Sequence, residues 1–280
     1  MRPGTFEFLR DFLKARSGLA LGPEKVYLIE TRLSRILRTH EFATLEDLVQ
    51  ALRFRPPAAL EREVVEAMTT NETLFLRDKA AFDHLEAKLL PELIAARGAK
   101  RRLSIWCAAC ATGQEPYSIA MLLDRRRVEL AGWDIRIVAT DLSTAVLERA
   151  KAGVYSQFEV QRGLPVKLLL EHFTKQGDAW AISPKIKAMV DFRPINLLGD
   201  IGPLGSFDLV LCRNVLIYFE PAVRTSLLTR IARQLSPDGA LLLGAAETVL
   251  GLSTPFVSTR ECPGVFRHAA AVKSDFARSA

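Results

Sequence analysis

One stretch of the sequence decides the fold: Ile105-Trp106-Cys107-Ala108-Ala109-Cys110-Ala111-Thr112-Gly113-Gln114-Glu115-Pro116-Tyr117-Ser118. The largely apolar stretch from Arg102 to Cys110 predicts a buried strand. The residues from Glu115 to Leu123 predict the helix that follows it. Small residues around Gly113 would let a ligand approach the backbone at the carboxyl end of this strand. A strand, a glycine turn and a helix in this order indicate a nucleotide-like site.

The glycine turn lacks the motifs that bind phosphate groups. It matches neither Gly-x-Gly-x-x-Gly nor a Gly-Lys-Ser/Thr loop, so NAD and ATP are not expected. A second strand, expected over 135–141, ends in Asp141, whose carboxylate would accept both hydroxyls of a ribose. The alternative is that Asp141 merely caps the next helix, because Ser143 and Thr144 follow it.

Strands and helices alternate through the rest of the chain. We expect helices over 79–96, 144–152 and 222–235, and strands over 189–194, 207–212 and 240–243, with a turn at Ser236-Pro237-Asp238-Gly239. This alternation predicts an α/β fold with a mostly parallel, doubly wound sheet.

The sequence also predicts how the chain divides. Residues 1–68 carry helical periodicity and predict an N-terminal all-helical domain, followed by an α/β domain over 69–280. Within the latter, 154–190 breaks the rhythm and predicts a small inserted β-subdomain with a hairpin turn at Gln176-Gly177-Asp178. Residues 269–280 are expected to form a flexible tail.

Composition limits the classes of function. The 280 residues carry a formal net charge of +6, which favours an acidic partner, and no apolar run reaches the ~20 residues that span a bilayer. A cytoplasmic protein without membrane insertion is expected. The four cysteines suggest no disulfides, and Cys107-x-x-Cys110 has neither a second cysteine pair nor a nearby histidine, so no metal is expected.

Five segments match, in order, the motifs of a known family. They are Thr69-Thr70-Asn71-Glu72-Thr73-Leu74-Phe75-Leu76-Arg77, the glycine segment ending Glu115-Pro116-Tyr117-Ser118, Ala139-Thr140-Asp141, Asn196-Leu197, and Cys212-Arg213-Asn214-Val215-Leu216-Ile217-Tyr218-Phe219. In these motifs the chain resembles the chemotaxis receptor glutamate methyltransferases, the CheR family. The resemblance implies a Rossmann-like class I methyltransferase with S-adenosylmethionine as cofactor and S-adenosylhomocysteine as product.

The resemblance also implies which residues line the cofactor site. Carried over position by position, they are Asn71, Thr73, Arg77, Glu115, Asp141, Asn196, Leu197, Asn214 and Val215. Structural alternatives remain open, because Thr69-x-x-Glu72 fits a helix capping box and the two later asparagines would simply bond backbone groups at strand ends. Phe75, Tyr218 and Phe219 would by default be core or site wall.

The activity implied is that of a protein-glutamate O-methyltransferase, which forms γ-methyl esters on chemoreceptor cytoplasmic helices and so tunes receptor adaptation. A glutamate side chain has a pKa of about 4.3 and is ionised at neutral pH, so no general base is needed. Arg77 is the candidate for orienting the substrate carboxylate, and Tyr218 for hydrogen bonding beside the transferring methyl group.

The family's acidic receptor helices suggest a use for a basic helix face. Lys25, Arg32, Arg35 and Arg38 would dock them, although an ordinary solvated surface is the alternative. Family members that bind the receptor's carboxyl-terminal peptide have a glycine-rich loop in the β-subdomain. Here Lys175-Gln176-Gly177-Asp178-Ala179 has one glycine, so no strong pentapeptide binding is expected.

Two other functions compete with this hypothesis. One is a class I methyltransferase with another acceptor, including nucleic acid, which the basic pI near 9.3 permits. The sequence lacks the Asn/Asp-Pro-Pro-Tyr/Phe motif of enzymes that methylate DNA amino groups, so a nucleic-acid partner is not expected. The other is a non-catalytic scaffold that binds S-adenosylmethionine only as a ligand, which the intact polar set disfavours.

Overall fold

The computed structural model describes residues 2–259 and 262–270. It divides into two compact units, one comprising residues 1–70 with 218–223 and the other comprising 71–217 with 224–280. Within the described residues, no helix is long and apolar enough to cross a membrane. The expected tail from residue 269 lies largely outside the described residues, and the backbone N–H of Ala269 donates to the carbonyl of Pro255 at 2.8 Å.

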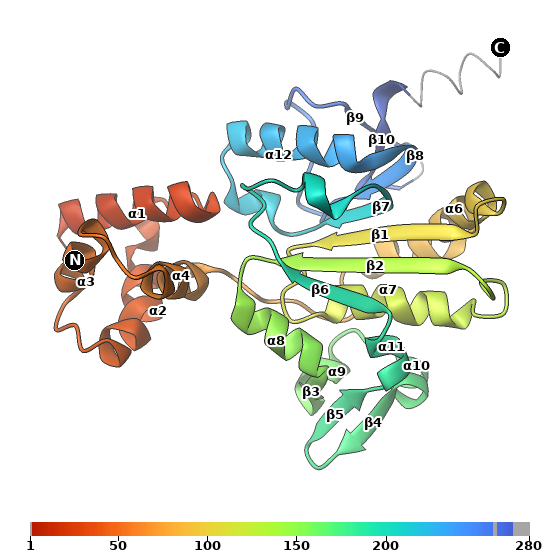
Figure 1. Ribbon diagram of the computed structural model, residues 1–280, viewed down its shortest axis with the longest axis horizontal. Coiled ribbons are helices and arrows are strands. Elements are labelled where there is room, and N and C mark those ends of the chain that lie inside the picture. The colour runs from red at the N-terminus through yellow and green to blue at the C-terminus, as the bar shows by residue number, and fades with distance from the viewer. Residues whose placement is uncertain (1, 260–261, 271–280) are drawn as a thin grey trace. The chain divides into compact units, whose positions relative to one another are not determined.

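The first unit is helical, as its periodicity predicts. Leu9 and Leu13 on the first helix, and Ile29 and Leu33 on the second, are fully buried and form part of its core. A short 3-10 turn precedes the second helix. The helices are α1 (Pro3–Ser17), α2 (Val26–Thr39), α3 (Leu45–Arg53) and α4 (Ala58–Met68), with the 3-10 turn η1 (Pro23–Lys25) before α2 (Figure 1).

The capping-box interpretation of Thr69-x-x-Glu72 is wrong. Residues 69–76 form no helix, and Thr69 instead ends α4, where its hydroxyl donates to the carbonyl of Glu66 at 2.7 Å. Arg32 also bonds this helix end, donating to the carbonyls of Met68 at 2.7 Å and Thr69 at 3.2 Å. Carbonyls of a last helical turn lack partners within the helix, so these side chains satisfy them.

The second unit is built on a seven-stranded sheet in the order β6-β2-β1-β7-β8-β10-β9. The first five strands in this order are parallel, and β10 pairs antiparallel with both β8 and β9. The mostly parallel sheet is thus confirmed. The strands are β1 (Arg102–Ala108), β2 (Asp134–Asp141), β6 (Val190–Pro194), β7 (Phe207–Cys212), β8 (Leu235–Leu242), β9 (Phe256–Ser258) and β10 (Val265–His268).

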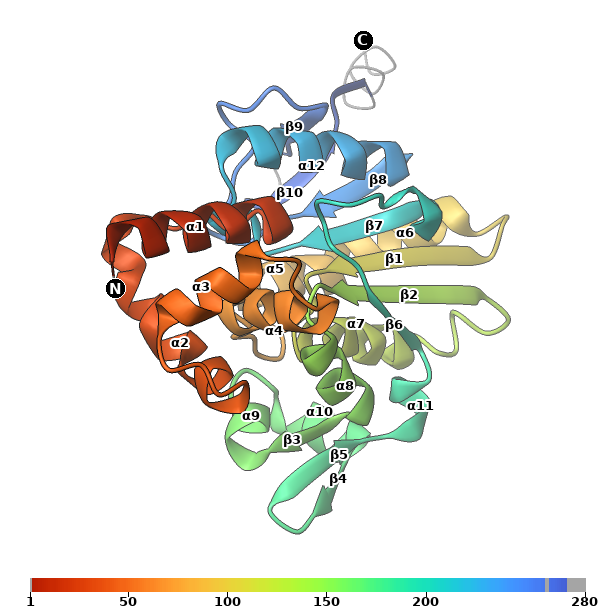
Figure 2. The ribbon, with the colours of Figure 1, turned by 60° about the vertical axis from the view of Figure 1, so that its left-hand side comes forward.

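The strand order places a switch point in the middle of this sheet. From β1 the chain moves outward through β2 to β6, and then returns to β7 on the other side of β1. Ligands of open α/β sheets bind where the order reverses, beyond the carboxyl ends of the strands. The sheet therefore points to the ends of β1, β2 and β7 as the functional edge, and Figure 2 shows these three strands side by side.

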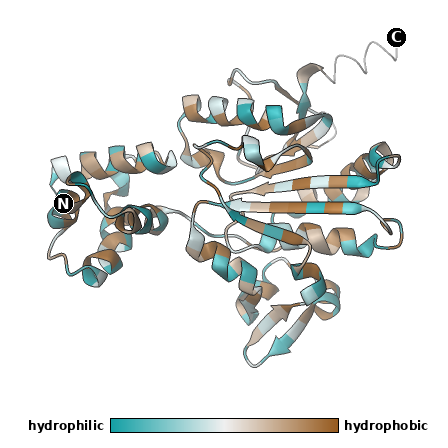
Figure 3. Ribbon diagram, viewed as in Figure 1, coloured by the Kyte–Doolittle hydropathy of each residue, from teal (hydrophilic) through white to brown (hydrophobic). Residues whose placement is uncertain are grey.

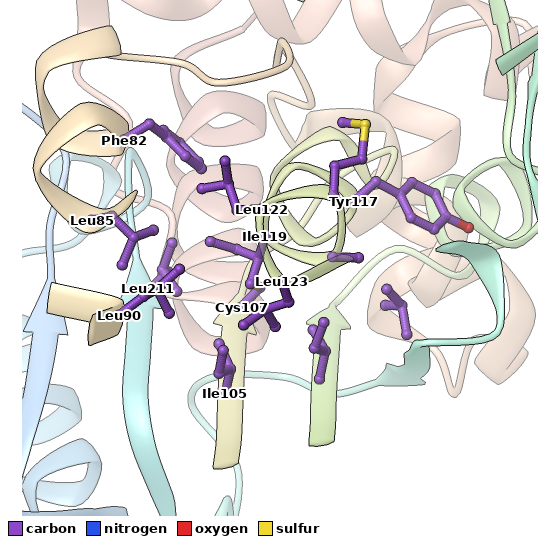
Figure 4. Packing of buried hydrophobic residues seen from close by; sticks show 14 of the residues in the cluster. Phe82, Leu85, Leu90, Ile105, Cys107, Tyr117, Ile119, Leu122, Leu123 and Leu211 are labelled. Atoms are coloured by element: carbon purple, nitrogen blue, oxygen red, sulfur yellow. The ribbon is translucent and has the colours of Figure 1, made fainter. Parts of the chain in front are cut away.

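Helices cover one face of β1 through alternating apolar side chains. Leu103 is fully buried in the core, as are Ile105 and Cys107, which lie among residues of the flanking helices (Figure 4). Figure 3 shows the matching pattern, with apolar colour along the middle of β1 and β2 and hydrophilic colour where they begin. The helices of this part are α5 (Lys79–His84), η2 (Leu85–Leu89), α6 (Leu90–Arg97), α7 (Gln114–Arg125) and α8 (Thr144–Ala152).

The helix expected over 79–96 forms, but with a π-helical turn in its middle. This turn, η2, lies just before Pro91 in the first turn of α6. A proline has no N–H to donate to the previous turn, which is a common cause of local widening or kinking in a helix.

The expected turn at 236–239 is wrong in its boundary, because β8 already begins at Leu235, directly after helix α12 (Pro221–Gln234). The pairing of β7 with β8 shifts register between Phe207, which pairs with Leu235, and Leu209, which pairs with Ala240. Residues 236–239 are therefore an irregularity inside β8 rather than a turn before it. A charge network lies here: Arg97 donates to the buried Asp208 at 2.6 Å and to both oxygens of the exposed Asp238 at 2.6 and 2.7 Å.

The inserted hairpin forms with a third strand beside it. An antiparallel sheet in the order β3-β5-β4 contains β3 (Val154–Ser156), β4 (Phe173–Gln176) and β5 (Ala179–Ile182). Gly177 supplies the positive φ of 59° that the turn between β4 and β5 requires. Helices α9 (Gln157–Gln161), α10 (Val166–His172) and α11 (Pro184–Lys187) and the 3-10 turns η3 (Gly202–Leu204) and η4 (Leu216–Tyr218) complete the elements.

Candidate functional site

Asp141 links two loops at the carboxyl edge of the large sheet. One carboxylate oxygen accepts the backbone N–H of Ala111, from the glycine turn, and the other accepts that of Ser143, each at 2.9 Å. Ser143 is itself the N-cap of α8, and its hydroxyl accepts the N–H of Val146 at 3.4 Å. Its side chain lies at the tip of β2 beside the glycine turn, where a ribose-binding acid is expected.

Gly113 stands at a position where a side chain would meet neighbouring protein atoms. It begins α7 with φ of 93°, and a Cβ at this position would lie 2.9 Å from Ala150 Cβ and 3.2 Å from Tyr155 Oη. The hydroxyl of Tyr155 donates to the carbonyl of Thr112 at 2.8 Å. The glycine is thus required by a left-handed backbone and by packing against α8 and Tyr155, whereas the approach of a cofactor to this turn stays a prediction.

Glu115 is held by a buried arginine. Arg213 Nη1 donates to Glu115 Oε2 at 2.9 Å, and Arg213 Nη2 donates to Asp78 Oδ2 at 2.7 Å and to the carbonyl of Arg77 at 2.8 Å. The arginine side chain is 1% exposed. This network joins the end of β7, the start of α7 and the segment before α5.

Burial raises the pKa of Glu115, and the charge of Arg213 and its hydrogen bond oppose that shift. The second oxygen, Oε1, has no hydrogen-bond partner in the part of the chain that the structure describes. A buried carboxylate with one oxygen unused attracts a cation, because an additional positive charge would stabilise its ionised form.

The segment over 71–78 is shaped by left-handed residues and anchored to α7. Leu76 and Asp78 have positive φ values of 51° and 60°, and the N–H of Leu76 donates to Ser118 Oγ at 3.0 Å. Arg77 Nη1 donates to the carbonyl of Glu72 at 3.1 Å. The side chains of Asn71 and Thr73 are partly buried and make no hydrogen bond to any described residue.

A loop after β6 carries Asn196 and Leu197. The side chain of Asn196 accepts the N–H of Leu198 at 3.0 Å, so it bonds backbone just after the strand. Arg230 on α12 donates to the carbonyls of Leu197, at 2.6 Å, and Gly199. Because Ile195 N–H donates to the carbonyl of Asp141 at 2.9 Å, this loop begins beside the tip of β2.

Asn214 and Val215 follow β7, and a single carboxylate fixes their backbone. Asn214 has a positive φ of 59°, and its N–H donates to Glu247 Oε2 at 2.7 Å. The N–H of Val215 donates to Glu247 Oε1 at 2.9 Å. The side-chain amide of Asn214 has no hydrogen-bond partner among the described residues.

The structure thus brings most of the predicted cofactor residues to one edge of one unit. Arg77 and Glu115 meet through Arg213, Asp141 meets the glycine turn, and the loop with Asn196 starts beside Asp141. Sequence reasoning missed Arg213 and Glu247. Arg213 directly follows the apolar strand β7, and Glu247 comes a few residues after the apolar strand β8. A charged residue close to the end of an apolar strand is the signal that would have marked both.

Other predicted residues belong to the helical unit. Tyr218 is grouped there, and its carbonyl accepts the N–H of Ala20 at 2.9 Å. Lys25 and Arg32 are partly buried, whereas Arg35 and Arg38 are exposed. In residues 2–259 and 262–270, no group of three histidine, cysteine or acidic side chains is arranged to hold a metal ion.

Models of two domains match the chain in succession. The description "CheR methyltransferase, all-alpha domain" matches residues 4–69, and "CheR methyltransferase, SAM binding domain" matches residues 71–262. The chain belongs to the CheR methyltransferase family. It is an S-adenosylmethionine-dependent methyltransferase with a class I fold, which confirms the resemblance drawn from the five motifs.

Curated relatives of this CheR family member match it over nearly their whole length. The chemotaxis protein methyltransferase Cher2 of Pseudomonas putida is 41% identical over 94% of this chain and 97% of its own. Chemotaxis protein methyltransferase 1 of Pseudomonas aeruginosa is 42% identical over the same shares. The chemotaxis protein methyltransferase of Vibrio parahaemolyticus is 40% identical over 91% of this chain and 92% of its own.

The side chains at the sheet edge fit S-adenosylmethionine. Asp141 suits ribose hydroxyls, and the unused oxygen of Glu115 suits a cationic amino acid group. The unpartnered amides of Asn71 and Asn214 supply both donors and acceptors without added charge. The donor set therefore fits a cofactor that has a ribose and an ammonium but no phosphate.

Proposed function

We propose that this protein transfers the methyl group of S-adenosylmethionine to glutamate side chains on the cytoplasmic helices of chemoreceptors. The products are a glutamate γ-methyl ester and S-adenosylhomocysteine, as in a protein-glutamate O-methyltransferase. The family supports this, and so do the names of the relatives, which are chemotaxis protein methyltransferases. The observation that carries the proposal is the pair of carboxylates, Asp141 and Glu115, which are buried or nearly so at the sheet's switch point.

We assign the cofactor contacts to the residues at this edge. Glu115 would hold the ammonium group and Asp141 the ribose, while the remaining polar and apolar residues would enclose the rest of the cofactor. The proposed set is Asn71, Thr73, Arg77, Glu115, Asp141, Asn196, Leu197, Asn214 and Val215.

The chemistry needs alignment more than proton transfer. A glutamate substrate with a pKa of about 4.3 is already a nucleophile at neutral pH. The bound cofactor supplies an electrophilic methyl group, and the protein must hold the attacking oxygen in line with it. We propose that Arg77 orients the substrate carboxylate by a charge-assisted hydrogen bond, and that Tyr218 donates a hydrogen bond beside the transferring methyl group.

Receptor docking is proposed for the exposed part of the basic face of α2. Arg35 and Arg38 are exposed, so they are available to an acidic helix, whereas the guanidinium of Arg32 is already bonded to the end of α4. The turn between β4 and β5 has one glycine, Gly177, and we expect no strong binding of a receptor-tail pentapeptide there. Because the receptor helices in question are cytoplasmic, the proposal places the protein in the cytoplasm.

Methyl transfer can be tested directly. The protein is incubated with S-adenosylmethionine labelled in its methyl group and with candidate receptor cytoplasmic fragments. We expect label on the receptor that alkali releases as methanol, because a carboxyl methyl ester is alkali-labile. Label that survives alkali would indicate another acceptor, and cofactor binding without any transfer to a panel of receptor fragments would favour a scaffold.

The role of Arg77 has a matched control in Arg125, an arginine at the far end of α7 that pairs with Glu86 at 2.5 Å. We expect Arg77→Ala to lower receptor methylation strongly and Arg125→Ala to leave it unchanged. Full methylation together with unchanged cofactor affinity in Arg77→Ala would show that Arg77 does not act on substrate or cofactor.

A further inference from the structure

Glu247 has no sequence-derived role, and its surroundings are unusual. It lies in the loop after β8, its N–H donates to the carbonyl of Gly244 at 2.9 Å, and the residue is 8% exposed. An ionised carboxylate at such a position is costly unless it is paired or hydrogen-bonded. In the described residues Glu247 forms no ion pair with a lysine, arginine or histidine.

Four backbone N–H groups replace that missing cation. Oε2 accepts those of Asn214 and Gly244, both at 2.7 Å, and Oε1 accepts those of Val215 at 2.9 Å and Leu216 at 2.7 Å. Hydrogen bonds to an ionised acceptor are roughly twice as strong as neutral ones. One side chain thereby ties the loop after β7 to the loop after β8.

The conformation that Glu247 holds is one that the chain would not adopt alone. Asn214 has a φ of 59°, a left-handed value that costs energy in a residue other than glycine. Such a conformation persists where surrounding contacts determine it. The consecutive N–H groups of residues 214–216 all point at the Glu247 carboxylate, which supplies those contacts.

Gly244 shows how closely the parts fit. A Cβ at this position would lie 2.6 Å from Asn214 Nδ2 and 2.9 Å from Glu247 Oε2. The asparagine amide therefore lies directly over the glycine backbone, and the same glycine donates to the carboxylate. Gly244, Glu247 and Asn214 form a single packed unit, named here the Glu247 clamp.

We propose that Glu247 is a positioning residue for cofactor binding, which acts by holding Asn214 and Val215 in the geometry that contacts S-adenosylmethionine. This inference rests on the proposed function, because it takes Asn214 and Val215 as cofactor contacts. Glu247 itself uses both oxygens on backbone N–H groups, so the role assigned to it is indirect.

The test replaces one carboxylate oxygen with an NH2 group. In Glu247→Gln, two of the four backbone donors face another donor, whichever way the amide is turned. The readout is the Kd for S-adenosylhomocysteine by calorimetry, alongside Tm without ligand. We expect the Kd to rise about tenfold or more, since two buried N–H groups lose their acceptor.

A matched control separates positioning from general loss of stability. Asp208 is a second buried carboxylate that accepts a backbone N–H, that of Ser104 at 2.8 Å, and it belongs to the charge network at the opposite end of β7. Asp208→Asn should lower Tm as Glu247→Gln does, yet leave the Kd for S-adenosylhomocysteine unchanged. If Glu247 had only a structural role, Glu247→Gln and Asp208→Asn would both lower Tm and would both leave the Kd for S-adenosylhomocysteine unchanged.

A second variant leaves every charge in place. Gly244→Ala inserts a methyl group into the Glu247 clamp, and we expect it too to raise the Kd for S-adenosylhomocysteine. If either clamp variant folds and binds S-adenosylhomocysteine as tightly as the wild type, the positioning role is wrong. If the wild type itself does not bind S-adenosylhomocysteine, the proposed function fails first, so the two failures are distinguishable.

Discussion

Arg213 and Glu115 form an ion pair in which Nη1 lies 2.9 Å from Oε2, with the arginine side chain 1% exposed and the glutamate side chain 12% exposed. The same guanidinium reaches Asp78, so one cation compensates two acids at the sheet edge. Its Nε is buried and has no hydrogen-bond partner within residues 2–259 and 262–270. A buried guanidinium that leaves a donor unsatisfied indicates that electrostatic compensation outweighs complete hydrogen bonding at this position.

Removing Arg213 should therefore be severe. Arg213→Met leaves two acids at the site without their cation, and breaking a buried ion pair on one side costs about 3–5 kcal/mol of unfolding free energy. We expect a loss of this size in urea denaturation. Adding Glu115→Gln to the same chain should recover part of it, since one uncompensated charge is then gone.

An exposed pair serves as the control for Arg213. Arg10 and Asp11 form an ion pair at 2.8 Å with side chains 42% and 65% exposed. Arg10→Met should change the unfolding free energy by no more than about 0.5 kcal/mol. Equal losses of unfolding free energy for Arg10→Met and Arg213→Met would show that burial does not determine how much these ion pairs stabilise the fold.

Stability should depend on pH through Glu115. Burial raises the pKa of Glu115 above its ordinary value. Such a carboxyl group contributes its full stability below its unfolded pKa, about 4.3, and this contribution is lost as pH rises through the raised folded pKa. The unfolding free energy of the wild type minus that of Glu115→Gln should therefore fall from acidic toward neutral pH.

The measurement is denaturation of both proteins without cofactor at a series of pH values. The ion pair with Arg213 lowers the pKa of Glu115 and so opposes the effect of burial, and the sign of the trend with pH shows which of the two is larger. Glu148→Gln, at a residue 71% exposed beside Lys151, serves as the exposed control. A difference that rises with pH would mean that Arg213 outweighs the cost of burial.

Substitutions at Gly113 and Gly177 distinguish the cost of backbone strain from the cost of overpacking the interior. Both have positive φ, but a Cβ at Gly177 would meet no atom within 4 Å, whereas at Gly113 it would meet Ala150. Gly177→Ala should cost only the strain of a left-handed alanine, about 1–2 kcal/mol. Gly113→Ala should cost about 1–3 kcal/mol more because it also overpacks the interior.

Thermal denaturation of the two variants tests this comparison. The expected order is wild type, then Gly177→Ala, then Gly113→Ala, in falling Tm. Equal Tm values for the two variants would mean that α8 and Tyr155 move away from the new methyl group at no cost.

The elements were predictable wherever local pattern decides them. Residues 144–152 form α8 with the expected bounds, because Ser143 caps the helix and Gly153 ends it in a left-handed conformation. The parallel strands follow from apolar runs that a doubly wound sheet buries on both faces. Even the hairpin between β4 and β5 followed from a local signal, the glycine of its turn.

The parts that could not be predicted depend on contacts distant in sequence. Arg213 meets Glu115 across 98 residues, and Glu247 meets Asn214 across 33. Nothing in the neighbours of these residues reveals such partners. Thr69 shows the converse, because its local pattern favours a capping box while the chain continues without a helix after α4.

The basic residues of α2 also divide into one that stabilises the fold, Arg32, and two that are proposed to dock the receptor, Arg35 and Arg38. Arg32 donates to Met68, Thr69 and Thr70, so Arg32→Ala should lower the unfolding free energy by about 1–2 kcal/mol through lost hydrogen bonds. Arg35 and Arg38 are exposed, and reversing both charges should leave stability within about 0.5 kcal/mol. Receptor methylation by the Arg35→Glu, Arg38→Glu protein should instead fall severalfold at low salt.

Salt gives the decisive comparison for that surface. At an ionic strength of 0.1 M, the attraction between exposed charges is largely screened beyond about 10 Å, and it weakens further as salt rises. Methylation by the wild type should therefore decline with added salt, while methylation by the doubly reversed protein should start low and depend on salt in the opposite sense. Identical salt profiles for the two proteins, measured with one receptor fragment, would place receptor docking on another surface.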